Sequence, residues 1–302
     1  MKISSLVITT LTAVSLIFTT TAFAAHHGDE AKAEHKSDKT AMTGLGAALE
    51  AQDDKAKARY QYRNPKQTLE YFGIEPGMKV LEALPGGGWY SKILLPYLGE
   101  NGHLIGVDYA IEMWPYFGGF ATEEFIEKKK TWTTTWVEDA QPWRSELGAN
   151  VSAATFSTIP SNIDGTLDAA LFIRALHNMA RFSDKANYLG DAMSTTFKAL
   201  KPGGIVGIVQ HQAREDRPDS WATGSNGYVK KSTIMQTMKA AGFEFVGESD
   251  INANPKDQAG EGDIVWRLPP SLSGAKGNAE LKANMLAIGE SHRMTLKFRK
   301  PS

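Results

Sequence analysis

An acid, a glycine-rich loop and a second acid follow one another between Glu82 and Asp108. Gly86, Gly87 and Gly88 come after an apolar run and before a helical pattern, the setting in which glycine loops bind nucleotides. Glycine lets a ligand approach the main chain, where helix amides point at it. Asp108 ends the next apolar run, and a carboxylate there can accept both hydroxyls of a ribose. We therefore expect a ligand that contains a nucleoside, with a tight strand-to-helix turn as the simpler alternative.

The glycine loop does not match either common phosphate-binding motif. Trp89 and Tyr90 follow Gly88, so the spacing G-x-G-x-x-G fails. No Gly-Lys-Ser or Gly-Lys-Thr follows, so the loop is not a P-loop. The sequence therefore favours a nucleoside site over a pyrophosphate site.

Two histidines follow apolar runs that we expect to be central strands, His177 after residues 167–176 and His211 after residues 203–210. Imidazole can accept a proton near neutral pH, which makes both histidines candidate catalytic residues. A hydrogen-bonded structural histidine is the alternative for each. Arg174 lies inside the first of these runs, where an unpaired charge is costly. It should therefore have a carboxylate partner or bind an anionic ligand.

Aromatic and polar residues near these positions are candidates for the wall of a substrate pocket. Aromatic side chains more often pack in the core, and that remains the alternative for each of them. No metal site is expected in the folded part of the chain. The candidate substrate-binding residues are Tyr62, Arg63, Trp89, Tyr90, Arg174 and Asn178.

A polar, turn-rich segment at residues 251–263 is either a lid over the site or an ordered surface loop. In the second case Asn252, Asn254 and Asp257 would satisfy backbone groups.

Apolar runs that alternate with helical patterns must position these residues. Strands are expected at residues 80–84, 103–110, 151–157, 167–176 and 203–212, and helices at 45–60, 64–73, 89–98, 123–130, 184–200 and 230–243. The segments 243–251 and 294–301 look like an antiparallel pair. Such alternation predicts an α/β fold whose parallel sheet is covered on both faces. In such sheets ligands bind beyond the carboxyl ends of the strands, where the strand order reverses.

The amino-terminal residues are predicted to lie outside this fold. Residues 1–24 have a basic start, an apolar stretch and an Ala-Phe-Ala cleavage pattern, as expected for a signal peptide. Residues 25–43 are polar and small and are predicted to form a disordered tether. The folded domain is then 44–302, in a periplasmic or secreted protein.

Charge and cysteine content limit the possible partners. The chain has 302 residues, a net charge of −1 and no cysteine. That charge argues against a broad nucleic-acid surface, and the mature protein can form no disulfide. We expect neither nucleic acid nor, after signal cleavage, a membrane as partner, and the oligomeric state stays open.

The chain resembles class I S-adenosylmethionine-dependent methyltransferases, and more closely a bacterial family of predicted exported methyltransferases. The resemblance covers residues 64–301 and rests on the segments LEALPGGGWYSKILLPYL, FIRALHNM, ALKPGGIVGIVQHQ, INANPKD and GESHRMTLKFRKP. It implies a three-layer Rossmann-like fold with a seven-stranded, mostly parallel sheet whose last strand is antiparallel, preceded by a helical extension. It also implies S-adenosylmethionine over Gly86 and Gly88, with Glu82 near its methionine end and Asp108 on its ribose.

Two functions follow from these observations. The first is an exported methyltransferase for a small molecule that the sequence does not identify. The second is a non-catalytic exported binding protein with the same fold. Leu84 and Pro85 stand where the family's loop has acid-x-Gly, and this departure favours the second function.

Overall fold

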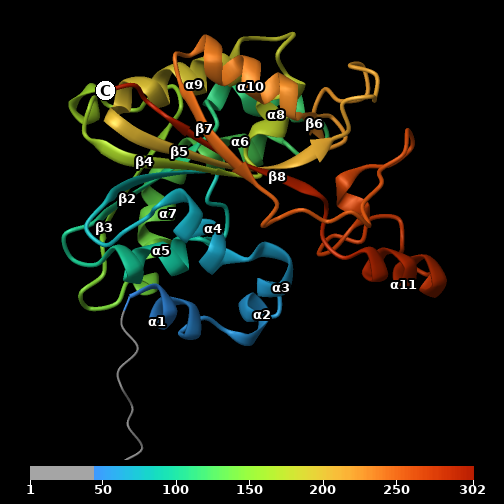
Figure 1. Cartoon of the computed structure of the whole chain (residues 1–302), viewed down its shortest axis with the longest axis horizontal. Coiled ribbons are helices and arrows are strands. Elements are labelled where there is room, and N and C mark those ends of the chain that lie inside the picture. Colours follow the sequence, from blue (N-terminus) through green and yellow to red (C-terminus); the bar gives the residue numbers. More distant parts are fainter. Residues whose placement is uncertain (1–43) are drawn as a thin grey trace, which may run out of the picture. The chain divides into compact units, whose positions relative to one another are not determined.

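The computed structural model describes residues 44–302, which form a sheet between two layers of helices (Figure 1). The strand order along the main path is β3-β2-β1-β4-β5-β8-β7, and β6 pairs with the end of β5. The strands are β1 (Lys79–Ala83), β2 (His103–Asp108), β3 (Asn150–Thr155), β4 (Leu167–Ile173), β5 (Leu200–Ala213), β6 (Val229–Lys230), β7 (Glu244–Ser249) and β8 (Arg293–Arg299).

The sheet is parallel apart from its last strand in sequence. β1, β2, β3, β4 and β5 pair in parallel, whereas β8 is antiparallel to both β5 and β7. The predicted mostly parallel α/β fold is therefore confirmed, and so is the predicted antiparallel pairing of the two carboxy-terminal segments. β8 lies between β5 and β7, so the final strand is an inner strand of the sheet.

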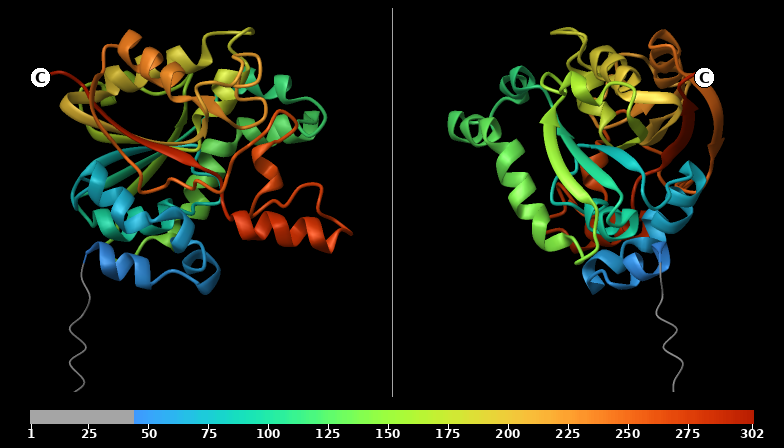
Figure 2. Two further views of the ribbon diagram at one scale, coloured as in Figure 1. Left: turned by 45° about the vertical axis from the view of Figure 1, so that its right-hand side comes forward. Right: turned by 90° about the vertical axis from the view of Figure 1, so that its left-hand side faces the viewer.

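Helices cover both faces of the sheet (Figure 2). The α-helices are α1 (Leu45–Glu50), α2 (Asp54–Lys57), α3 (Tyr60–Arg63), α4 (Pro65–Phe72), α5 (Ser91–Leu98), α6 (Glu123–Lys130), α7 (Trp132–Ala140), α8 (Leu176–Arg181), α9 (Tyr188–Ala199), α10 (Lys231–Ala240) and α11 (Ala279–Ile288). The 3₁₀ helices are η1 (Ile111–Phe117), η2 (Gln141–Trp143), η3 (Ser161–Ile163) and η4 (Val265–Arg267). α1 to α4 form the predicted helical extension.

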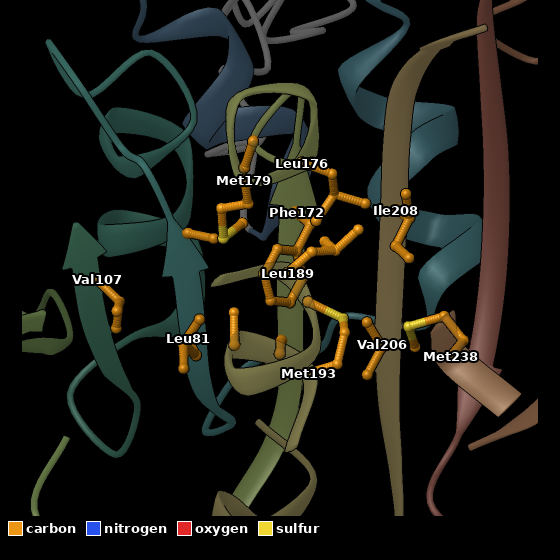
Figure 3. Close-up of a cluster of buried hydrophobic side chains, with 14 of the residues drawn as sticks. Leu81, Val107, Phe172, Leu176, Met179, Leu189, Met193, Val206, Ile208 and Met238 are labelled. Carbon is orange, nitrogen blue, oxygen red and sulfur yellow. The ribbon is translucent and has the colours of Figure 1, made fainter. Parts of the chain in front are cut away.

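The strands read as continuous apolar runs because both of their faces are buried. Val80 belongs to the core under α1, α4, α5 and α7, and its neighbour Leu81 to the core under α8, α9 and α10. Figure 3 shows the second core, where Leu81, Phe172 and Ile208 of three strands meet helix side chains. Side chains alternate between the faces of a strand, so β1, β2, β4 and β5 contribute to both cores.

The amino-terminal helices differ in two details from the predicted ones. Residues 45–60, predicted as one helix, contain a break at 51–53, where the Asp53 side chain accepts a hydrogen bond from Ala56 N and begins α2. Asn64 does not cap α4 with its side chain, although Pro65 occupies the first turn as predicted. Its left-handed backbone, with φ of 41°, turns the amide towards Ile251 O, to which Nδ2 donates at 2.6 Å.

The predicted signal peptide and tether lie outside the described residues, and the division of the chain at residue 44 stays a prediction. Among residues 44–302, no helix has the length and apolarity to cross a bilayer.

Candidate functional site

The strand order reverses between β1 and β4, which marks the place where ligands bind in such sheets. The residue after each of these two strands has a left-handed backbone, with φ of 56° at Leu84 and 61° at Arg174. Their amides donate to the neighbouring strands, Leu84 N to Val107 O at 2.7 Å and Arg174 N to Val209 O at 2.6 Å. Such strained backbone in residues other than glycine costs about 1 kcal/mol or more and clusters at functional sites. The candidate site therefore lies beyond the ends of β1 and β4.

The three glycines after β1 have different surroundings. A Cβ atom on Gly88, where φ is 77°, would lie 2.2 Å from the Trp143 ring. Trp143 belongs to the core on the α5 face, so Gly88 allows η2 to pack against the loop. Gly86 and Gly87 are exposed and have no side chain within 4 Å of an added Cβ. Only Gly86 and Gly87 therefore leave backbone open to a ligand.

Gly88→Ala should lower the free energy of unfolding by about 2 kcal/mol, because the methyl group would force the Trp143 ring to move and the left-handed backbone would be strained. Gly87→Ala is the matched control and should change it by less than about 0.5 kcal/mol. Urea denaturation of both variants measures the difference. Similar values for the two would show that Trp143 does not press on the loop.

Glu82 lies under the loop inside the sheet. Its side chain is buried, and Ser91 Oγ in the first turn of α5 donates to its carboxylate at 2.6 Å. Burial raises the pKa of Glu82 to about 7. The carboxylate thus anchors α5, and the predicted contact with a cofactor stays a prediction.

Asp108 ends β2, as predicted, but both of its oxygens have partners in the chain. Lys129 Nζ of α6 donates to Oδ2 at 2.7 Å and Tyr109 N donates to Oδ1 at 2.8 Å. The Lys129 ammonium also lies 4.2 Å from the centroid of the Trp114 ring. Burial raises the pKa of Asp108, against the opposing effect of Lys129. A ribose at Asp108 must therefore compete with Lys129.

A cavity of about 290 Å³ lies next to Asp108, at the carboxyl ends of β2 and β3. Its walls are mainly aromatic and apolar, and a few polar groups stand among them. This combination is typical of pockets for flat organic ligands. The walls include Tyr109, Met113, Phe156, Met179, Tyr188 and Asp191.

The two predicted catalytic histidines lie side by side, with ring centroids 5.7 Å apart. His211 Nδ1 is 2.5 Å from Ser291 Oγ, whereas His177 Nδ1 is buried and has no hydrogen-bond partner among the described residues. Burial and then Arg174 lower the pKa of His177 to about 4. Burial and then His177 lower the pKa of His211 well below its usual value. Both rings are therefore neutral at pH 7.

Asn178 turns away from the histidines. Its Nδ2 donates to the Tyr109 hydroxyl at 3.2 Å, and Tyr109 lines the aromatic cavity. Asn178 therefore supports the wall of that cavity, and its side chain makes no hydrogen bond to Arg174.

Arg174 belongs to a group of four arginines around one carboxylate, which we call the arginine cluster. It consists of Arg59, Arg63, Arg174, Arg293 and Glu290. Three of the arginines contact Glu290: Arg59 Nη2 at 2.5 Å, Arg63 Nε at 3.3 Å and Arg293 Nη1 at 3.5 Å. Although burial opposes the shift, these arginines lower the pKa of Glu290.

The predicted aromatic residues border the arginine cluster. The Arg63 guanidinium lies 4.5 Å from the centroid of the Trp89 ring, and the Tyr90 hydroxyl donates to Arg63 O at 3.4 Å. Tyr62 O accepts a hydrogen bond from Arg293 Nη2 at 2.6 Å. The predicted Tyr62, Arg63, Trp89 and Arg174 thus come together.

Sequence reasoning missed Arg59, Glu290 and Arg293. The available signal was the pair Glu290 and Arg293, whose opposite charges stand three residues apart at the start of the last strand. The segment 251–263 holds this pair in place as an ordered loop, since Asn254 Nδ2 donates to Ile288 O and Glu290 O at 2.8 and 2.6 Å.

No family model and no curated relative matches the chain. Solved structures with a similar fold include the [4+2]-cyclase SpnF, at 16% identity, coverage of 80% of both chains and a TM-score of 0.48. A Haloferax volcanii complex of the Trm112 activator with a putative methyltransferase matches at 14% identity, 86% and 99% coverage and a TM-score of 0.49. A Burkholderia thailandensis 1,6-didemethyltoxoflavin-N1-methyltransferase matches at 13% identity, 85% coverage of both chains and a TM-score of 0.44. At these values the function has to be argued from the chain's own residues.

In the part of the chain that the structure describes, no group of three or more His, Asp or Glu side chains is arranged to hold a metal ion.

Proposed function

We propose that the chain is an exported S-adenosylmethionine-dependent methyltransferase that acts on a small molecule. One observation carries the proposal: at the reversal of strand order, the open backbone of Gly86 and Gly87 and the carboxylate of Asp108 lie beyond neighbouring parallel strands, and an aromatic cavity adjoins Asp108. These are the parts that a nucleoside cofactor requires. The cavity would hold the adenine ring, Asp108 would bind the ribose, and the glycine loop would contact the methionine part of the cofactor.

The cofactor, when bound, would supply an activated methyl group, so the protein mainly has to orient the acceptor and take up a proton. His177 is suited to the second task because its neutral ring has an unpaired Nδ1. A pKa of about 4 makes it a weak base, which limits the reaction to acceptors that are readily deprotonated or need no deprotonation.

The Lys129–Asp108 ion pair favours a second candidate function, a binding protein that retains the fold without turnover. Lys129 occupies the carboxylate that a ribose needs, and Trp114 holds the ammonium in place. In this case the cofactor would bind weakly and no methyl group would be transferred.

Calorimetry tests the cofactor site directly. The wild type should bind S-adenosylhomocysteine, and Asp108→Asn should weaken that binding at least tenfold, since it removes the charge that a ribose contacts. Asp168→Asn is the control, because Asp168 also pairs with a lysine but stands near the amino end of β4. Absence of heat with both S-adenosylmethionine and S-adenosylhomocysteine would contradict the methyltransferase proposal.

Lys129→Met should strengthen S-adenosylhomocysteine binding about fivefold, because the ribose would no longer compete with a bond worth about 1 kcal/mol. Methionine keeps the apolar contact with Trp114. Lys128→Met, at an exposed position one residue away, should leave the dissociation constant unchanged. Weaker binding by Lys129→Met would mean that Lys129 assists the ligand.

Export is the remaining part of the proposal and is supported by the pattern of residues 1–24. Amino-terminal sequencing of protein from the periplasm should begin at Ala25. A chain that retains residues 1–24 in the cytoplasm would contradict export.

A further inference from the structure

We propose that the arginine cluster binds the anionic part of the methyl acceptor, and that the acceptor is a small molecule with at least two negative charges, such as a polycarboxylate or a phosphate ester. This inference rests on the proposed function and specifies its substrate class. It starts from the charges that the described residues bring together beyond the ends of β4 and β5.

The charges within the cluster do not balance. Arg59, Arg63 and Arg293 share the single carboxylate of Glu290, and no described side chain pairs with Arg174. Four arginines and one glutamate leave a formal charge of +3. Arg63 and Arg293 are each only 3% exposed, so water screens these charges poorly.

Within residues 44–302, no nearby group supplies the missing negative charge. His177 and His211 are neutral, as their lowered pKa values require. Asp257, the next buried carboxylate, is already occupied, since it accepts hydrogen bonds from Arg267 Nη2 at 2.8 Å and from the Tyr228 hydroxyl at 2.9 Å. An excess of buried cations is costly unless an anion is bound.

Unpaired donors mark where the anion would bind. Among the described residues, nine side-chain N or O atoms are buried without a hydrogen-bond partner, and two of these atoms are the donors Trp89 Nε1 and Arg174 Nε, in residues that follow β1 and β4. Buried polar atoms almost always have partners, so unpaired ones need an explanation. Both residues lie at the cluster. The Arg63 guanidinium lies 4.5 Å from the centroid of the Trp89 ring. Arg174 N donates to Val209 O of β5, two residues before His211, which lies opposite Arg293 in the pairing of β5 with β8.

The size of the charge decides between two possible sources of the anion. S-adenosylmethionine carries one carboxylate of its own, next to a cationic amine, and cannot neutralise an excess of three. An acceptor with two negative charges would remove most of the excess, and one with three would remove all of it. A cavity of about 180 Å³ borders the cluster at Glu290 and Arg293, and Lys256 adds a further cation to its wall.

The cluster also borders the proposed methyl-transfer site. Trp89 directly follows Gly88 in sequence, and Arg174 and His177 stand after β4 across the point where strand order reverses. An acceptor anchored by its anionic part would therefore present its reactive atom near the glycine loop and His177. Arg174 is placed to hold the acceptor.

The test uses the mature protein, three probe anions and one variant. Citrate and pyrophosphate, at fixed ionic strength, should raise the thermal midpoint and bind in calorimetry, whereas acetate should bind at least tenfold more weakly. Arg174→Gln should reduce citrate affinity at least tenfold. Without anion it should unfold at the same temperature as the wild type or higher, because it removes a half-buried charge that has no countercharge among the described residues.

Arg214→Gln is the matched control, since Arg214 is an exposed arginine paired with Asp216, and its citrate affinity should match that of the wild type. Equal stabilisation of the wild type and Arg174→Gln by citrate would reduce the effect to general salt binding and overturn the inference. A lower midpoint for Arg174→Gln without anion would also overturn it, since Arg174 would then be a paired structural residue.

S-adenosylhomocysteine separates the inference from the proposed function. Unchanged S-adenosylhomocysteine affinity in Arg174→Gln, together with lost citrate binding, is the expected result. If Arg174→Gln loses affinity for both ligands, and citrate competes with S-adenosylhomocysteine, the cluster binds the cofactor's carboxylate. That result would overturn the assignment to the acceptor. Binding of S-adenosylhomocysteine without binding of citrate or pyrophosphate would overturn only the inference. Binding of citrate without S-adenosylhomocysteine would contradict the methyltransferase proposal, and the cluster would then be an anion site without a methyl acceptor.

Discussion

Glu290→Gln should lower the free energy of unfolding by about 3 to 5 kcal/mol, the usual effect of removing one partner from a buried ion pair. The carboxylate is 4% exposed and is the charge that Arg59, Arg63 and Arg293 share. Glutamine keeps the shape and one acceptor oxygen but leaves the guanidiniums without a countercharge. Guanidinium chloride or urea titration at pH 7 measures the loss.

Two comparisons make this prediction specific. Glu244→Gln breaks the Glu244–Arg299 pair, whose side chains are half exposed, and should cost less than about 1 kcal/mol. The pH supplies the second comparison. The arginines lower the pKa of Glu290, so its contribution to stability is present above the unfolded pKa and is lost as the pH falls through the folded pKa. The variant and the wild type should therefore converge in acid, and a constant difference at every pH would contradict the role of charge.

Glu82→Gln should change the pH dependence of stability by about 3 kcal/mol between pH 4.5 and pH 8. Burial raises the pKa of Glu82 to about 7 from its usual 4.5, so the folded state holds a proton that the unfolded state releases. The stability this provides is complete below pH 4.5 and is lost as the pH rises through 7. Glutamine cannot ionise and should lack this loss.

The relevant quantity is the difference between the two proteins at each pH. Urea titrations at pH 4.5, 6, 7 and 8 should show the wild type losing stability relative to Glu82→Gln, with most of the change complete by pH 7. Replacing the acid by an amide can change the free energy of unfolding by a constant amount, and that amount cancels when the two proteins are compared across pH. Parallel curves for the two proteins would show that Glu82 titrates normally, and that water or a cation reaches it.

The sequence predicted the sheet well because its strands are buried on both faces and read as apolar runs that helices separate. β1, β2, β4 and β5 lie close to the predicted residues for this reason. The same pattern predicted that Gly86 and Asp108 lie at the ends of neighbouring strands.

The partners of these residues could not be predicted, since they come from distant parts of the chain. Lys129 reaches Asp108 only because α6 folds back over the end of β2, and Trp143 reaches Gly88 from η2. Nothing in the local pattern around either site indicates these contacts. The glycine loop therefore looked more open in the sequence than it is.

The arginine cluster shows the same limit more clearly. Arg59 and Glu290 are 231 residues apart. The sequence predicts that Arg174 needs a partner. It does not indicate that three other arginines contact one carboxylate, that of Glu290. Only the fold reveals the excess of positive charge.

The position of β8 has a consequence for how the molecule is made. β8 is hydrogen-bonded to β5 on one side and to β7 on the other, and it follows all the other described strands in sequence. A nascent chain that has not yet produced residues 290–299 leaves the edge of β5 open and β7 without a partner strand, and an open sheet edge is a site for aggregation. Such a chain also lacks Glu290 and Arg293, so the arginine cluster and the closure of the sheet are completed by the same short segment.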